Sequence, residues 1–282
     1  MKRTQSSITA EGIAFARALE TEKPEGQRIL NDPYARRFIR PWFWFLSKLF
    51  LNSAQRRSPG VVDFLVARAR YMDDYLQTCL QGGLRQTVIL GAGFDSRAYR
   101  IDGLQDGMRI FEVDHPATQQ LKLETLHKIF GKTPGHVTYV PVDFNTQTLA
   151  SRLLECGYSD RLKTLFIWEG VCMYLTAEAV DNTLAFVTGH AAPGSAIIFD
   201  YIHASALRGA GQRSEIRSMQ RYRRFTGEGL IFGIPKGEVA PFLEQRGFKQ
   251  VVDADSKTLE HLYYPDGRVV SPVYAIVHAE VP

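Results

Sequence analysis

The stretch that decides the fold reads Thr87-Val88-Ile89-Leu90-Gly91-Ala92-Gly93-Phe94-Asp95-Ser96-Arg97. Its apolar start, residues 87–90, predicts a short buried strand. Gly91 and Gly93 have no Cβ, so they allow a sharp turn and let the backbone approach a ligand closely. A dinucleotide-binding fingerprint would place a third glycine at position 96, where this chain has Ser96. Taken alone, the two glycines are as compatible with a plain strand-to-helix turn as with a ligand site.

Strands and helices alternate downstream of this stretch. Apolar runs predict strands at 108–113, 136–142, 164–168 and 195–200, and helices are predicted between them at 116–130, 148–156 and 177–190. Such alternation predicts a parallel sheet with right-handed crossovers. A helix at 238–246 leads to two last strands, 248–252 and 273–277. The polar stretch between them leaves no obvious room for a crossover helix, so we expect an antiparallel pair.

The prediction is therefore an α/β fold with a Rossmann-like sheet of seven strands, mostly parallel with a terminal antiparallel strand. This is the layout of class I methyltransferases. For 282 residues we expect a single domain. Residues 1–82 are expected to form an N-terminal helical cap with helices at 9–20 and 63–80. Residues 83–282 are expected to form the core, with a lid insertion at 203–234.

Composition and charge exclude several classes of protein. With 45% hydrophobic and 23% charged residues, the chain does not have the composition of a disordered protein. Its 34 Lys and Arg against 30 Asp and Glu give a net charge of +4, which permits an anionic ligand but is no signature of nucleic-acid binding. Cys79, Cys156 and Cys172 form no CxxC pair, so we expect no disulfide framework, no metal site and a cytoplasmic location.

The most apolar stretch is the aromatic run Trp42–Leu51, which contains Lys48. It is shorter than the ~20 residues that a membrane span needs, and no apolar run of signal-peptide length follows Met1. We expect a soluble monomer or weak dimer. We interpret the run as a packed helix, with a wall of the substrate pocket or an interfacial patch as the alternatives.

Acidic residues follow successive predicted strands. Asp114 ends the second strand and could accept hydrogen bonds from both hydroxyls of a ribose. Asp143 follows the third strand, where it could bind an adenine amino group with Phe144 against the ring. Glu169 follows the fourth strand and could pair with an ammonium group. Open α/β sheets bind ligands at this carboxyl edge, so the set favours an adenosine with an attached amino acid, which is S-adenosylmethionine.

Four ordered motifs carry a resemblance to a known family: residues 88–100, 111–116, 141–144 and 168–175. They resemble the leucine carboxyl methyltransferase-like family of S-adenosylmethionine-dependent O-methyltransferases. Upstream, Ala67-Arg68-Ala69-Arg70-Tyr71-Met72-Asp73-Asp74 and Asn31-Asp32-Pro33-Tyr34 extend the resemblance to nearly the whole chain.

The resemblance implies a role for each matching residue. It implies cofactor contacts from the glycine turn, namely Gly91, Ala92, Gly93 and Asp95. It implies that Asp114 binds the ribose, that Asp143 and Phe144 bind the adenine, and that Glu169 binds the ammonium group of the methionine part.

Arginines complete the implied site. Arg68 or Arg70 would bind the methionine carboxylate, and the sequence leaves open which of them does. Arg17 is a loose match to a basic residue that joins this contact in some relatives, and it is equally compatible with a surface charge. Tyr174 and Arg70, or Arg68, are the candidates for orienting the acceptor as catalytic residues. Tyr201 is a weaker candidate, and a core role for either tyrosine is as compatible with the sequence.

The acceptor is expected to be a small molecule or a peptide. A carboxylate needs no base, whereas a hydroxyl does, and the histidines offer no motif-placed base, so a carboxylate or an acidic hydroxyl is favoured. Residues 208–228 hold six arginines against two glutamates, which indicates either a solvated helix face or recognition of an acidic acceptor. The alternatives are an NAD(P)-dependent oxidoreductase and a non-enzymatic RNA-binding or adaptor protein; we expect no nucleic-acid partner.

Overall fold

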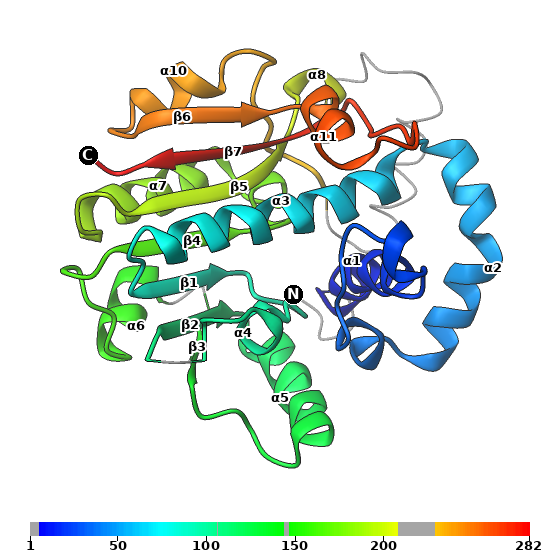
Figure 1. Cartoon of the computed structure of the whole chain (residues 1–282). Helices are drawn as coiled ribbons and strands as arrows, with labels where there is room; N and C mark the ends of the chain where they lie inside the picture. The colour runs from blue at the N-terminus through cyan, green and yellow to red at the C-terminus, as the bar shows by residue number, and fades with distance from the viewer. Residues whose placement is uncertain (1–5, 106, 144–146, 208–228) are drawn as a thin grey trace.

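A computed structural model describes residues 6–105, 107–143, 147–207 and 229–282 of the chain. It contains one seven-stranded sheet with the order β3-β2-β1-β4-β5-β7-β6 (Figure 1). β7 pairs antiparallel with both of its neighbours, β5 and β6. The predicted α/β fold with a seven-strand, mostly parallel sheet is therefore confirmed. The strands are β1 Gln86–Leu90, β2 Arg109–Asp114, β3 Val137–Pro141, β4 Thr164–Trp168, β5 Ala196–Ile202, β6 Lys249–Ala254 and β7 Tyr274–Glu280.

Helices cover both faces of the sheet and extend beyond its carboxyl edge (Figure 1). The N-terminal region holds α1 Ser6–Thr21, η1 Glu25–Gln27, η2 Ala35–Phe38, α2 Pro41–Arg57 and α3 Val61–Gln81. The core holds α4 Arg97–Arg100, α5 Pro116–Phe130, α6 Leu149–Glu155, η3 Cys172–Tyr174, α7 Ala177–His190, α8 Ala204–Leu207, α10 Val239–Glu244 and α11 Ser256–Tyr263. None of the helices described is long and apolar enough to cross a membrane.

The sheet is buried on both faces, which explains why its central strands are apolar throughout. Along β4, Leu165 and Ile167 face the cluster that includes α3, whereas Phe166 and Trp168 face the cluster that includes α7. All five residues of β4 are buried. Strands of a parallel sheet that is covered on both sides have this near-continuous apolar pattern.

The connection between β6 and β7 contains a short helix that was not predicted from the sequence. The expectation that no crossover helix lies there holds, but α11 occupies Ser256–Tyr263. Asp255 caps it, because its Oδ1 accepts hydrogen bonds from the amides of Lys257 and Thr258 at 3.1 and 3.0 Å. Leu259 is its buried contact. α11 packs beside α3 and joins two antiparallel strands, so it needs no crossover.

The aromatic run Trp42–Leu51 forms the predicted helix, which packs on the protein along one side only, through Phe43, Trp44 and Leu51. No residue of α2 is buried. α2 lies at the outer edge of the molecule beyond α1, where only one of its faces can touch the protein (Figure 1). In the predicted lid, α8 and a bridge between His203 and Ile234 are described; the arginine-rich residues 208–228 lie outside the described residues.

Candidate functional site at the carboxyl edge

The glycine turn follows β1 directly, at the carboxyl edge of the sheet. Gly91 and Gly93 have φ angles of +66° and +43°, in the left-handed region that favours glycine. A Cβ on Gly91 would lie 2.4 Å from Cγ2 of Val171, in the loop that follows β4. The amide of Ala92 donates to the carbonyl of Val113 at 3.0 Å. The turn is thus wedged between the ends of β2 and β4.

Asp114, at the end of β2, holds this turn in place. Its Oδ2 accepts a hydrogen bond from the amide of Gly93 at 2.5 Å, and its Oδ1 accepts one from the amide of His115 at 2.6 Å. Burial raises the pKa of Asp114, and the two amides act in the opposite direction. A carboxylate offers about four lone-pair sites, so two remain for a ligand.

The end of β3 is less completely described. Asp143 is half-buried, and its amide donates to Oε1 of Gln147 at 3.1 Å. Phe144, the predicted adenine contact, lies outside the described residues. Asp143 therefore lies at the expected edge, one strand away from Asp114.

Glu169, after β4, lies between two buried arginines. Arg68 from α3 donates through Nε to Oε1 of Glu169 at 3.1 Å, and Arg97 from α4 donates through Nη1 to Oε2 at 2.6 Å. Burial alone would raise the pKa of Glu169, but Arg97 and Arg68 outweigh it and hold the pKa well below its ordinary value. Arg68 Nη2 lies 2.9 Å from Oε1 in an ion-pair contact, yet this buried nitrogen makes no hydrogen bond.

Asp200, near the end of β5, contacts Arg68 and the loop that carries Glu169, and the sequence prediction did not include it. Its Oδ2 accepts from Nη1 of Arg68 at 2.6 Å, and its Oδ1 accepts from the amide of Gly170 at 2.6 Å. Burial raises its pKa, which Arg68 opposes. Asp200 is fully buried, so it fixes both the arginine and the loop that carries Glu169.

Arg97 is a second residue to which the prediction gave no role. Besides Glu169, it binds Asp95 and Asp73, the latter through Nε at 2.7 Å. Arg100 forms ion pairs with both Asp73 and Asp32, and Nε of Arg17 lies 2.8 Å from Oδ2 of Asp32. Ion pairs thus form one continuous buried chain, in the order Asp200, Arg68, Glu169, Arg97 with Asp95, Asp73, Arg100, Asp32 and Arg17.

Not every predicted site residue takes part in this chain of ion pairs. Arg70 points elsewhere: its side chain is 43% exposed and binds Asp74 and the carbonyl of Ile29 at 2.8 and 2.7 Å. Arg17 is no surface charge, because it is buried and its Nη2 donates to the carbonyl of Phe94 in the glycine turn at 2.6 Å.

The two predicted tyrosines lie in different surroundings. Tyr174 is half-buried in η3, where its amide donates to the carbonyl of Val171 at 3.0 Å. Tyr201 is buried in the core, and its hydroxyl donates to Oδ1 of Asp253 on β6 at 3.0 Å. The loop of Val171 also borders the glycine turn, so Tyr174 is the tyrosine that belongs to this region.

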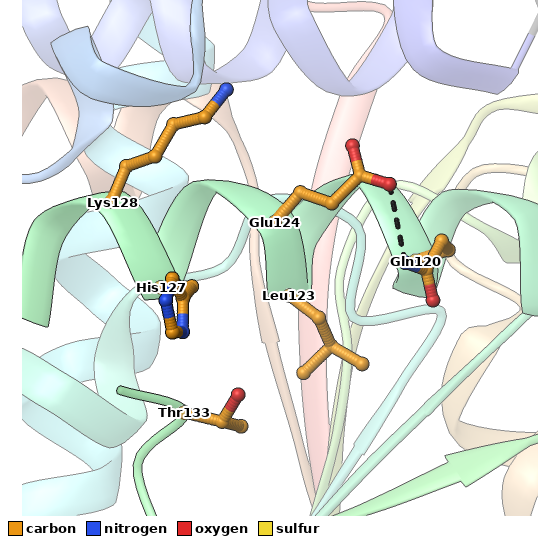
Figure 2. A pocket seen from close by; sticks show the side chains of 6 residues that line it. All are labelled: Gln120, Leu123, Glu124, His127, Lys128 and Thr133. Carbon is orange, nitrogen blue, oxygen red and sulfur yellow. Dashed lines mark hydrogen bonds between the residues drawn. The ribbon is translucent and has the colours of Figure 1, made fainter. Parts of the chain in front are cut away.

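Shallow hollows elsewhere on the surface do not include these residues. Figure 2 shows one along α5, lined by Gln120, Leu123, Glu124, His127, Lys128 and Thr133, with a 3.1 Å hydrogen bond from Gln120 to Glu124. Four of its polar side chains, Gln120, Glu124, His127 and Lys128, are exposed on α5, and Thr133 lies in the segment that follows the helix. In the part of the chain that the structure describes, no group of three or more His, Cys, Asp or Glu side chains is arranged to hold a metal ion.

Comparison with known proteins identifies relatives along the whole chain. The family model described as leucine carboxyl methyltransferase matches residues 10–188. A Bacillus subtilis protein named "Putative S-adenosyl-L-methionine-dependent methyltransferase YktD" is 31% identical over 99% of this chain and 98% of its own length. A Mycobacterium tuberculosis relative of the same description is 28% identical, over 93% of this chain and 88% of its own.

Solved structures resemble the fold. A DUF574 family protein from Streptomyces avermitilis superposes with a TM-score of 0.57 at 14% identity, covering 95% of this chain and 97% of its own. The structure of "a putative methyltransferase" from Thermobifida fusca gives a TM-score of 0.55 at 16% identity, covering 94% of each chain. At these identities the likeness is one of fold.

Proposed function

The chain belongs to the leucine carboxyl methyltransferase family and is an S-adenosylmethionine-dependent methyltransferase, and from this premise we propose that it methylates a carboxylate oxygen of a small acidic molecule or a peptide. The comparisons favour neither the oxidoreductase nor the RNA-binding alternative.

Three features of the edge fit S-adenosylmethionine. Gly91 and Gly93 offer a backbone without side chains, Asp114 retains lone pairs for the ribose hydroxyls, and Arg68 Nη2 is a buried donor without a hydrogen bond. We propose that Arg68 binds the methionine carboxylate and Glu169 the ammonium group. Asp143, Phe144, Ala92 and Asp95 remain proposed contacts.

The net charge of the buried chain of ion pairs supports the binding of S-adenosylmethionine at this edge. It contains five carboxylates and four guanidinium groups, an excess of one negative charge when all are ionised. S-adenosylmethionine carries an ammonium, a sulfonium and a carboxylate, which sum to one positive charge. Burying the excess negative charge is costly without a counter-ion, and a ligand of this charge would offset that cost.

The observation that supports a carboxylate acceptor is that Glu169 and Asp200, the two acids beside the loop after β4, both form ion pairs with Arg68. Both acids are therefore occupied as ion-pair partners and are not poised to remove a proton. When bound, S-adenosylmethionine supplies a methyl group activated by the sulfonium charge. A carboxylate acceptor is already ionised, so the protein needs to orient it and exclude water rather than deprotonate it.

We propose Tyr174 as the residue that orients the acceptor, because η3 follows the Glu169–Val171 loop. The exposed position of Arg70 and its pairing with Asp74 favour Arg68 over Arg70 at the cofactor. The arginines of 208–228 remain proposed contacts for an acidic acceptor.

Methyl-labelled S-adenosylmethionine tests the proposal. The purified protein is incubated with labelled cofactor and fractionated lysate, with S-adenosylhomocysteine as the competitor, and labelled products are treated with base. A carboxyl methyl ester releases volatile labelled methanol, which is the expected result. A label that stays on the product after base would mean an ether or an amine and would contradict carboxyl methylation, while leaving methyl transfer itself intact.

A pH profile gives an independent check. Carboxylates have ordinary pKa values near 4, so methylation of a carboxylate should show a nearly constant kcat/KM from about pH 6 to 9. A kcat/KM that rises steadily over this range would indicate an acceptor hydroxyl that must first lose its proton.

A further inference from the structure

α2 presents a continuous apolar face to the outside of the molecule. Five of its large apolar residues are between 42% and 67% exposed, and their spacing of three and four residues places them on one side of a helix. They are Trp42, Phe45, Leu46, Leu49 and Phe50. We call this set the α2 face. Scattered exposed apolar residues are ordinary, but a contiguous patch of this kind marks an interaction site.

The opposite side of α2 holds the helix against the protein. Phe43, Trp44 and Leu51 pack on the core cluster. The Trp44 ring meets the Phe15 ring of α1 edge to face, with centroids 5.2 Å apart. α2 is therefore anchored by one apolar side while the other points outward, along the outer margin of the molecule (Figure 1).

The charge around the α2 face has a single sign. Between Pro33 and Val62 the sequence has six Lys and Arg residues and no Asp or Glu. Two of the six are neutralised from outside this segment, Arg40 by Glu11 and Lys48 by Glu22. The other four are exposed, two before α2 and two at its C-terminal end: Arg36, Arg37, Arg56 and Arg57.

We propose that α2 lies in the surface of an anionic phospholipid bilayer, with the α2 face inserted at the level of the headgroups. A lipid surface offers apolar depth and negative charge together, which is what a helix with this pattern binds. Helices that lie in this interface carry tryptophan, phenylalanine and leucine on their apolar face. The proposal concerns where the enzyme is held and does not depend on the nature of its acceptor.

A second copy of the chain fits this surface less well. A symmetric dimer places the same patch on both sides of the interface, so the four exposed arginines of one copy would face those of the other. No acid of the segment 33–62 could pair with them. Like charges brought together in this way are destabilising.

Flotation with lipid vesicles tests the proposal. The full-length protein is mixed with vesicles of phosphatidylcholine alone or with about a quarter of phosphatidylglycerol, and the bound fraction is measured. We expect binding to the anionic vesicles and little to the neutral ones. Phe45→Ser with Leu49→Ser should lower the partition coefficient about tenfold or more. The control, Leu154→Ser with Val252→Ser, removes two side chains that are 46% exposed on other elements and should bind as the wild type.

Charge-reversal variants separate the electrostatic contribution to vesicle binding from the apolar one. Arg56→Glu with Arg57→Glu should abolish the preference for anionic vesicles, whereas Arg161→Glu with Lys249→Glu, two exposed residues on other elements, should keep it. Added salt should weaken wild-type binding. Circular dichroism melts verify that each variant folds.

Two results would overturn the proposal. One is wild-type protein that stays unbound with anionic vesicles at low salt. The other is a concentration-dependent dimer, seen by sedimentation, that Phe45→Ser with Leu49→Ser dissociates; this would assign the α2 face to a second copy.

Discussion

At the scale of single residues, Asp114 connects the glycine turn to the proposed ribose contact. We expect Asp114→Ala to weaken S-adenosylhomocysteine binding by about 1.5–3 kcal/mol, because hydrogen bonds to a charged acceptor are lost. Isothermal titration calorimetry measures this change. Asp102→Ala, which removes an exposed carboxylate, is the control and should bind normally. Unchanged affinity of a folded Asp114→Ala protein would remove Asp114 from the site.

Arg68 and Arg70 provide a matched pair on one helix. Arg68→Lys keeps the charge but loses the fork of donors that reaches Glu169 and Asp200. We expect it to reduce cofactor affinity about tenfold or more, whereas Arg70→Lys should change it less than about twofold. Calorimetry on both proteins decides, with thermal melts to verify folding. A larger loss for Arg70→Lys would reverse the assignment.

Several residues of the candidate site could be found from sequence by one rule, that acids after successive strands share an edge. That rule found Asp114 and Glu169, and it also applies to Asp200, which ends the predicted strand 195–200. The buried side of α3 includes Phe64, and Arg68 is one turn further on the same side, so helical spacing could have distinguished it from Arg70. Arg97 gave no such signal, because an arginine after a turn is usually solvated; only its tertiary contacts reveal its role.

At the scale of elements, the glycine turn and the loop after β4 constrain each other. Gly91→Ala should destabilise the protein by about 2–4 kcal/mol, through left-handed strain and overlap with Val171. Adding Val171→Ala should recover the part that comes from overlap, about 1–2 kcal/mol. Urea denaturation measures both changes.

The control for this prediction is Gly189→Ala in α7, where an added Cβ meets no atom within 4 Å. It should stabilise the protein by up to about 1 kcal/mol, because alanine favours a helix more than glycine does. A Gly91→Ala variant as stable as the wild type would show that the turn tolerates a side chain.

Elements were predictable where their pattern had one interpretation. The strands at 87–90, 108–113 and 164–168 are short apolar runs, and each is found within a residue or so of its predicted bounds. α2 was predictable as a helix but not as an exposed one, because an apolar pattern does not tell an inward face from an outward one. α11 was missed because its polar sequence contributes one buried leucine to the core.

At the scale of the whole molecule, the buried chain of ion pairs joins the N-terminal helices to the sheet. Its ends are Arg17 on α1 and Asp200 on β5, and Arg68 on α3 and Arg97 on α4 lie between them. Breaking a buried pair by removing one partner typically costs about 3–5 kcal/mol. Changes at Glu169 should therefore be detected in global stability as well as in cofactor affinity.

The pH dependence of that stability tests whether the two arginines lower the pKa of Glu169 in the folded protein. Its pKa is held below the ordinary 4.5 because Arg97 and Arg68 outweigh burial. A carboxyl group with a lowered folded-state pKa stabilises the protein above its unfolded pKa, and this contribution is lost as the pH falls toward the folded value. The difference in unfolding free energy between the wild type and Glu169→Gln should thus be constant from about pH 7 to 5.5. Below about pH 4 this difference should narrow by up to about 1.4 kcal/mol per pH unit.

Urea denaturation followed by circular dichroism at several pH values measures the difference in unfolding free energy. The control is Glu244→Gln, which removes an exposed carboxyl group. A difference that stays constant down to about pH 3.5 would mean that folding does not lower the pKa of Glu169, so the two arginines would not outweigh the effect of burial.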